Sequence, residues 1–169
     1  FMGCTGLTGK LQFAPNTVIN SFAFGGCINI TEINADAVLA FDTCAFEDCI
    51  NLKGIIKFSN SVSEIPKGLF YNCYSIEKVE FNKQIKSIGS YAFYNCTKLN
   101  GTLVLPVDVS VIEEYAFANT NYSMLKYYPP APPIECSPYS FPEDIKINTS
   151  DIYIYEEFCG IPVNENETE

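Results

Sequence analysis

The side chains with the greatest chemical potential in this 169-residue chain are eight cysteines and several adjacent pairs of carboxylates. The sequence contains no histidine, which excludes the usual serine and cysteine triads, because these need an imidazole base. Most zinc sites use histidine or a C-x-x-C pair, and the sequence contains neither. The glycine-rich motifs that cradle nucleotide phosphates are absent as well.

The adjacent carboxylates could in principle act as an acid and a base. They form four doublets, which are Glu47-Asp48, Glu113-Glu114, Glu143-Asp144 and Glu156-Glu157. Nothing in the sequence brings two doublets together in an apolar cleft, and charged doublets on loops are usually solvated. We therefore expect no enzymatic activity, no metal site and no cofactor.

The charge of the chain limits its partners. The formal net charge is −10, and all ten basic residues are lysines. Nucleic acids and anionic membrane surfaces bind basic footprints, so neither is an expected partner.

The apolar content of the chain limits its class. No run of about 18 apolar residues is present, so we expect no insertion of this segment into a membrane. Apolar residues form 47% of the chain, which is enough to bury a core.

Five of the eight cysteines belong to an internal repeat. A phenylalanine recurs every 22–24 residues, at Phe1, Phe24, Phe46, Phe70, Phe93, Phe117 and Phe141. A cysteine follows three residues later in the first five units, at Cys4, Cys27, Cys49, Cys73 and Cys96. A unit of about 23 residues is too short to bury its own apolar face, so successive units must stack on one another.

Alternating segments within the units predict the elements that stack. The segments LQF, IKF, VEF and LVL place apolar residues on one side of a strand and polar residues on the other. Strands that recur once per unit are expected to pair in parallel about 4.8 Å apart. The Ala-Phe phrase predicts a short helical turn in which each phenylalanine fills the same layer. Gly9, Gly54 and Gly101 explain the one-residue differences in period.

The repeated unit resembles a known family. The segment IKSIGSYAFYNCTKLNGTLVLP, residues 85–106, follows the pattern I-x-x-x-A-F-x-x-C-x-x-L-x-x-[IV]-x-[FL]-P of BspA-like leucine-rich repeats. The resemblance covers about residues 1–125, with departures at Cys44, Leu69 and Thr120. It implies an α/β, β-rich leucine-rich-repeat fold, a right-handed and horseshoe-like solenoid of stacked parallel strands. It also implies a surface-displayed or secreted protein that adheres to host cells, matrix proteins or other microbes.

The pattern changes after residue 125. We interpret residues 126–163 as a degenerate last turn and a C-terminal β cap, and residues 164–169 as a tail or linker. The IKI and IYIY segments alternate as strands do, and a solenoid end needs a cap over its core. The PPAPP segment has a second interpretation, as a ligand for a proline-recognising module.

The cysteines and asparagines allow covalent modification. We interpret the five repeat cysteines as buried apolar fillers. Cys136 and Cys159 share the C-terminal region and are candidates for a disulfide, although the sequence leaves free thiols equally open. Candidate N-glycosylation sites are Asn29, Asn121, Asn148 and Asn166. A fifth sequon begins at Asn95, whose side chain we expect to cap a turn.

A partner surface is expected where strand residues alternate with the core. The exposed positions are Lys10, Gln12, Glu32, Asn34, Asp36, Ile55, Lys57, Ser59, Lys78, Glu80, Asn82, Thr102 and Val104. An ordinary solvated face explains this mixed surface equally well. An aromatic column at Phe22, Tyr91, Tyr115 and Tyr139 is explained by stacking within the fold.

We therefore expect a non-enzymatic cell-surface or secreted module that binds proteins, with adhesion to host cells or extracellular-matrix proteins as its role. The alternatives are an architectural spacer without a ligand of its own and an intracellular scaffold with reduced thiols.

Overall fold

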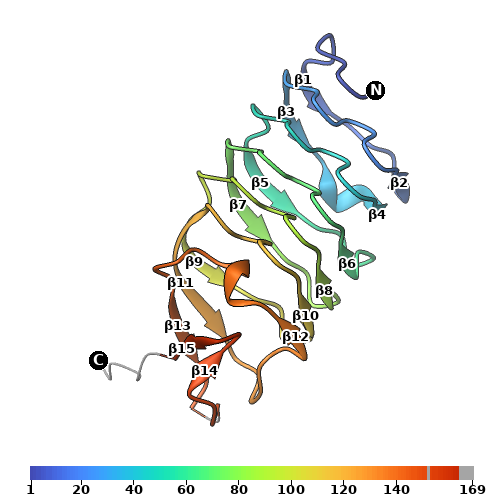
Figure 1. Cartoon of the computed structure of the whole chain (residues 1–169). Coiled ribbons are helices and arrows are strands. Elements are labelled where there is room, and N and C mark those ends of the chain that lie inside the picture. Colours follow the sequence, from blue (N-terminus) through green and yellow to red (C-terminus); the bar gives the residue numbers. More distant parts are fainter. Residues whose placement is uncertain (152, 164–169) are drawn as a thin grey trace.

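The computed structural model describes residues 1–151 and 153–163. The chain winds into about six coils that stack along one axis, from the N-terminal end in blue to the C-terminal end in red (Figure 1). Over the described residues, the helical elements are two short 3-10 turns, η1 (Ala35–Ala37) and η2 (Pro138–Ser140). The β-rich solenoid predicted from the repeat is confirmed.

One side of the solenoid, which we call the strand side, is formed by seven strands. These are β1 (Gly9–Leu11), β3 (Ile30–Ile33), β5 (Gly54–Lys57), β7 (Ile76–Glu80), β9 (Asn100–Val104), β11 (Asn121–Tyr127) and β13 (Lys146–Thr149). Every pairing among them is parallel, as the repeat predicts. Their apolar residues, such as Ile56 and Leu103, are buried, because alternate side chains point to opposite faces.

A second row of shorter strands follows at the next corner of each coil. The row consists of β2 (Thr17–Ile19), β4 (Val38–Phe41), β6 (Glu64–Ile65), β8 (Ser87–Ile88), β10 (Val111–Ile112) and β12 (Glu135–Cys136). β2 pairs with β4, and β6, β8, β10 and β12 form one parallel sheet. The buried residues Ile65, Ile88 and Ile112 hold equivalent places in this sheet, since each lies opposite the next.

The third side, which we call the turn side, carries the Ala-Phe phrases. It comprises residues 20–27, 42–49, 66–73, 89–96, 113–120 and 137–144. The prediction of a helical turn here is wrong. The first five of these segments form consecutive tight turns, in which the residues two before and two after the phenylalanine adopt a left-handed conformation, whereas the sixth, 137–144, contains the 3-10 turn η2. Tyr91, with φ of 59°, and Asn95, with φ of 60°, are examples.

The turns replace the helix because they leave backbone groups free to join the coils. The N–H groups of Phe22 and Phe24 donate to the carbonyls of Thr43 and Ala45 in the next coil, at 3.0 and 2.9 Å. The alternate N–H groups bond within their own coil, as Cys27 does to Phe24. A helix would satisfy its N–H groups internally and leave the coils unconnected on this side.

The core is organised by the repeated phenylalanines. Neighbouring rings stack along the axis from Phe1 to Phe141, with centroid separations between 5.2 and 5.9 Å. Phe46, Phe70, Phe93 and Phe117 are fully buried. The predicted matching layers are therefore confirmed.

The buried cysteines do more than fill space. The thiols of Cys27, Cys49, Cys73 and Cys96 donate to the carbonyl oxygen of the phenylalanine one coil back, at 3.1–3.2 Å. Each thiol thereby gives the carbonyl a second partner, beside the N–H three residues further along its own coil. Thr120 holds the equivalent place in the next unit, but its hydroxyl donates to Phe117 of its own coil at 2.8 Å.

The C-terminal region closes the core. β13 continues the sheet next to β11, and Phe141 stacks on Phe117. An antiparallel hairpin, β14 (Glu157–Phe158) and β15 (Ile161–Pro162), follows at the C-terminal end (Figure 1). Phe158 is fully buried there against Tyr127 and Phe141.

The structure answers two questions about this region, namely whether its two cysteines are bonded and whether IKI and IYIY are strands. A disulfide joins Cys136 of β12 to Cys159 in the turn of the hairpin. The IKI segment contributes to β13, as predicted, whereas the described residues of IYIY, 153–155, are not a strand. The chain turns at that point, because the Tyr153 N–H bonds back to Ser150, and the Tyr153 ring packs edge-on against Tyr127.

Candidate functional site

The strand side is divided into three separate sheets. Their strand orders are β1-β3, β5-β7 and β9-β11-β13, so neither β3 and β5 nor β7 and β9 are paired over the described residues. The first strand of each sheet has a left-handed glycine as its first or second residue, namely Gly9, Gly54 or Gly101, with φ of 73–79°. The pairing register shifts beside each glycine.

The additional glycine accounts for the places where the sheet breaks. A break occurs where a unit without the glycine meets a following unit that has it. The extra residue displaces the backbone at the corner, so the hydrogen-bond ladder cannot continue from the preceding coil.

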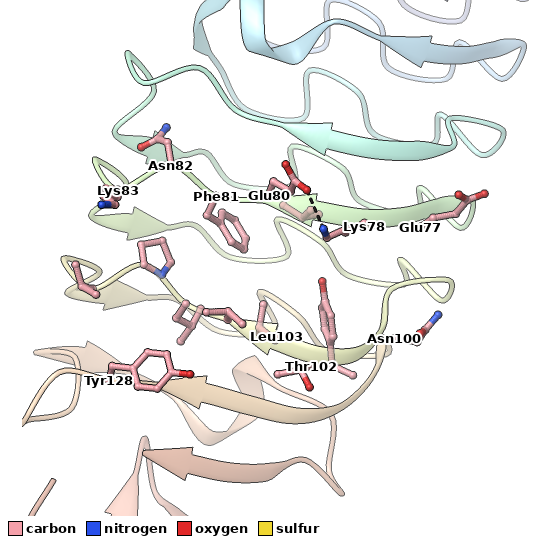
Figure 2. Close-up of a pocket in the computed structure, with 16 residues that line it drawn as sticks. Glu77, Lys78, Glu80, Phe81, Asn82, Lys83, Asn100, Thr102, Leu103 and Tyr128 are labelled. Atoms are coloured by element: carbon pink, nitrogen blue, oxygen red, sulfur yellow. Dashed lines mark hydrogen bonds and ion pairs between the residues drawn. The ribbon is translucent and has the colours of Figure 1, made fainter. Parts of the chain in front are cut away.

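The break between β7 and β9 opens into a groove of about 820 Å³. Figure 2 shows Lys78 and Glu80 of β7 on one side and Thr102 of β9 and Tyr128 on the other. Three of its apolar residues are unusually exposed for their type, Val104 at 51%, Val107 at 53% and Tyr128 at 48%. Exposed apolar side chains that gather in one hollow are typical of interaction sites.

The groove has a rigid floor. Phe81, which is half-buried, stacks on Phe58 and meets Phe93 and Phe117 edge-on, with centroids 5.9–6.3 Å apart. Because these partners belong to the packed core, the groove is fixed by the core itself.

Two of the charged residues around the groove form an ion pair. The Lys78 ammonium lies 2.8 Å from the Glu80 carboxylate, and this hydrogen bond, with the nearby positive charges, lowers the pKa of Glu80. Lys57 lies opposite Glu80 on β5, and Lys10 pairs with Glu32 at 3.8 Å further along the strand side. The groove therefore combines an apolar floor with a rim of mixed charge.

Most of the predicted partner surface lies on the strand side. Five of its residues line the groove, namely Lys78, Glu80, Asn82, Thr102 and Val104. Lys10, Glu32, Ile55 and Lys57 are exposed on the earlier strands. Gln12 is exposed just beyond β1, and Asp36 is exposed within η1.

Three of the predicted residues instead connect coils. The Asn34 amide bonds to both the N–H and the carbonyl of Phe13, at 2.6 and 2.9 Å. The Ser59 hydroxyl donates to the Val38 carbonyl at 2.6 Å. Asn82 is buried, and its amide donates to the Ser59 carbonyl at 2.5 Å. Their hydrogen-bonding groups are therefore used within the fold.

Sequence reasoning missed part of the groove. Val107 and Tyr128 lie outside the alternating strand positions, so no periodic signal marks them as neighbours of Val104. The recurring glycine was visible in the sequence, but its effect on strand pairing depends on the register between coils.

A ladder of polar side chains runs along the turn side. Asn72 donates its amide to Asp48, Asn95 to Asn72, and Asn119 to Asn95, at 2.8–2.9 Å. Asn95 was expected to cap a turn, and in the structure its side chain joins neighbouring coils. Asparagine suits this place because it tolerates the left-handed conformation.

The candidate glycosylation residues differ in their surroundings. The side-chain nitrogens of Asn29 and Asn121 donate to the carbonyls of Thr5 and Thr97 in the preceding coil, at 2.8 and 2.7 Å. Asn148 lies on β13 opposite Lys126 and is half-buried. Asn166, like the tail at 164–169, lies outside the described residues.

Residues 1–151 and 153–163 contain neither a metal-binding cluster nor a membrane-spanning helix. No group of three or more His, Cys, Asp and Glu side chains in these ranges is arranged to hold a metal ion. In the same ranges, no helix has both the length and the apolar character needed to cross a bilayer.

One solved structure with a similar fold agrees with this architecture. A leucine-rich cell surface protein from Faecalibacterium prausnitzii A2-165 is similar over 89% of this chain, with 18% identity and a TM-score of 0.53. This chain spans 56% of the length of that structure. A leucine-rich repeat protein from Bacteroides ovatus ATCC 8483 has 14% identity and a TM-score of 0.37, over 94% of this chain and 66% of its own. A search of curated proteins gives no match.

The family comparison matches most of the chain. The model of the BspA type leucine rich repeat region matches six copies over residues 17–148, a range that includes the coil of Phe141. The chain belongs to the BspA-type leucine-rich repeat family.

Proposed function

We propose that this chain is a non-enzymatic module that binds protein partners through its strand side, with the groove between β7 and β9 as the centre of the contact. The observation that carries the proposal is the exposure of Val104, Val107 and Tyr128 around one hollow. The partners are proteins of host cells, of the extracellular matrix or of other surfaces, and adhesion is the biological role.

The groove suits a protein partner for physical reasons. Interface energy concentrates in a few apolar or aromatic residues that are surrounded by polar ones. Here the exposed valines and the ring of Tyr128 would be covered, while Lys78 and Glu80 at the rim already neutralise each other. The rigid floor under Phe81 lowers the entropy lost on binding.

We also propose that the module works at a cell surface or outside the cell. The disulfide between Cys136 and Cys159 is of a kind that persists in oxidising environments. The similar protein from F. prausnitzii is described as a cell surface protein. In this proposal, residues 126–163 hold the last coil and its cap, and the adhesive contact is made mainly by the repeats before them, with Tyr128 at the boundary.

The test is a solid-phase binding assay against a panel of purified extracellular-matrix proteins. Val104→Ser combined with Val107→Ser is compared with Val18→Ser combined with Leu39→Ser, which changes exposed apolar residues on β2 and β4. Burial of two valines predicts a loss of about tenfold or more in affinity for the groove variant alone. Equal binding by both variants would show that the groove is not the binding site. Absence of binding by the wild-type protein would favour the alternative, an architectural spacer without a ligand of its own.

A further inference from the structure

A second surface, on the turn side, is formed by five tyrosines. Tyr91 stacks on Tyr115 at 5.0 Å, and Tyr115 stacks on Tyr139 at 6.0 Å. Tyr71 stacks on Tyr94 at 5.3 Å, and Tyr91 meets both of these rings edge-on, at 6.2 and 5.5 Å. The five rings therefore form one continuous cluster, which we call the tyrosine cluster.

The cluster is open to solvent and held in place. Tyr71, Tyr91, Tyr94 and Tyr115 are half-buried, and Tyr139 at the end of the row is 63% exposed. The backbone at three of the rings is tied to a neighbouring coil. The Tyr91 N–H donates to the Glu114 carbonyl at 3.1 Å, and the carbonyls of Tyr71 and Tyr94 accept from N–H groups of the preceding coil at 2.8 and 2.9 Å. Such rings lose little conformational entropy when a partner covers them.

The net charge of the turn side indicates which class of partner fits the tyrosine cluster. The turn side carries seven carboxylates and one lysine, Lys67, so its net charge is −6 of the −10 of the whole chain. The carboxylates are Asp42, Glu47, Asp48, Glu113, Glu114, Glu143 and Asp144. Two of them are placed near the rings by hydrogen bonds: the Glu113 carboxylate accepts from the N–H and hydroxyl of Ser90, next to Tyr91, and the Asp48 carboxylate accepts from the amide of Asn72, next to Tyr71.

We propose that the tyrosine cluster and its carboxylates form a second binding surface, for an extended polypeptide segment rich in arginine or lysine. Aromatic rings attract cations through their electron-rich faces and cover the aliphatic stems of long basic side chains. Carboxylates beside the rings pair with guanidinium groups. The surface is separate from the groove, so it can engage a different part of the same partner or a second partner.

The test measures binding of a labelled synthetic peptide of alternating Arg and Ser by fluorescence anisotropy, with an alternating Glu and Ser peptide as the control ligand. The aromatic variant is Tyr115→Leu with Tyr139→Leu, which keeps every charge. Its matched control is Tyr128→Leu, the same change in the groove. The acidic variant is Glu113→Gln with Glu114→Gln, and the Val104→Ser with Val107→Ser variant separates this surface from the groove.

The expected result is binding of the Arg peptide alone. The aromatic variant should bind about fivefold more weakly, because two cation–π contacts of about 0.5 kcal/mol each are lost. Tyr128→Leu and the groove variant should bind as the wild type does, whatever the outcome of the matrix-protein assay. If Tyr115→Leu impairs folding in a thermal melt, Tyr139→Leu alone provides the aromatic test, since that ring is mostly exposed.

Two results would overturn the proposal. One is absence of binding to the Arg peptide. The other is full binding by the aromatic variants together with loss in the acidic variant, which would show only unspecific attraction between opposite charges.

Discussion

The thiol of Cys96 donates a hydrogen bond to the carbonyl oxygen of Phe70, 3.2 Å away in the preceding coil. Both residues are fully buried, and the same relationship recurs three more times along the axis. The cysteine column therefore links coils as well as filling the core, which explains why a thiol suits this place better than a methyl group.

Replacing Cys96 should test this link. Cys96→Ala removes the thiol donor and leaves a small cavity, so we expect the free energy of unfolding to fall by about 1–3 kcal/mol. Cys4→Ala is the matched control, because Cys4 is only half-buried and begins the column. Urea unfolding followed by circular dichroism measures both. Equal losses in the two variants would show that neither the hydrogen bond nor the burial of Cys96 contributes to stability.

Alkaline pH should destabilise the protein through the same column. Burial raises the pKa of Cys49 from 9.0 to about 12 and also raises the pKa of Cys73 and Cys96. The folded state thus keeps protons that the unfolded state releases, and stability present below pH 9 is lost as the pH rises towards 12. Burial shifts the pKa of Tyr122 in the same direction.

Denaturation midpoints in urea at pH 8, 9 and 10 would measure this loss. Cys49→Val should show a shallower decline than the wild type, since it has no thiol to ionise at that place. A wild-type midpoint that stays constant over this range would contradict the argument.

The polar ladder on the turn side yields a third prediction. Asn95 accepts from Asn119, donates to Asn72 and holds a φ of 60°. Asn95→Gly keeps the backbone conformation and loses the ladder, so we expect a loss of about 1 kcal/mol. Asn95→Val loses the ladder and also fits the left-handed backbone poorly, because a β-branched residue is strained at positive φ. We expect its free energy of unfolding to fall by about 1–3 kcal/mol more than that of Asn95→Gly. Equal stabilities of these variants in thermal melts would show that neither effect matters.

The features that could be predicted from the sequence are those that leave a regular pattern in it. The stacked phenylalanines could be predicted, because Phe46, Phe70 and Phe93 share a column whose period is visible in the chain. The tight turns could not be predicted from Tyr91 or Tyr115, since tyrosine seldom adopts a positive φ. The asparagine or glycine that stands two residues after five of the seven repeat phenylalanines was the available signal for a left-handed turn.

The groove could not be predicted, because it arises from a difference between two neighbouring units and not from the sequence of one unit. Gly54 and Gly101 could be recognised as insertions, but the consequence arises only where the coil before them lacks the glycine. The presence of Val107 and Tyr128 around the same groove likewise depends on the path of the chain after β9 and β11. Local patterns therefore predict the stack, and the breaks in the stack come from differences between neighbouring units.

The disulfide should stabilise the cap. It closes a loop between residues 136 and 159, a separation of 23 residues, and holds the hairpin over Phe141 and Tyr127. Cys136→Ser with Cys159→Ser should lower the free energy of unfolding by about 2–4 kcal/mol. Limited proteolysis should then cut first in the C-terminal region, with the earlier coils intact. An unchanged cleavage pattern would show that packing of Phe158 alone retains the hairpin.

Reversing charges on the strand side distinguishes a binding face from a spacer. Lys57 and Glu80 lie opposite each other on β5 and β7, and the Glu80 carboxylate also accepts from Lys78. Lys57→Glu with Glu80→Lys preserves the net charge and should have little effect on stability, because exposed ion pairs contribute about 0–1 kcal/mol. A partner that matches the wild-type charge pattern should bind about tenfold more weakly, since like charges then face each other. The matched control is Glu143→Lys with Lys67→Glu on the turn side, and equal affinities of the two variants for a matrix protein would exclude the strand side from the contact.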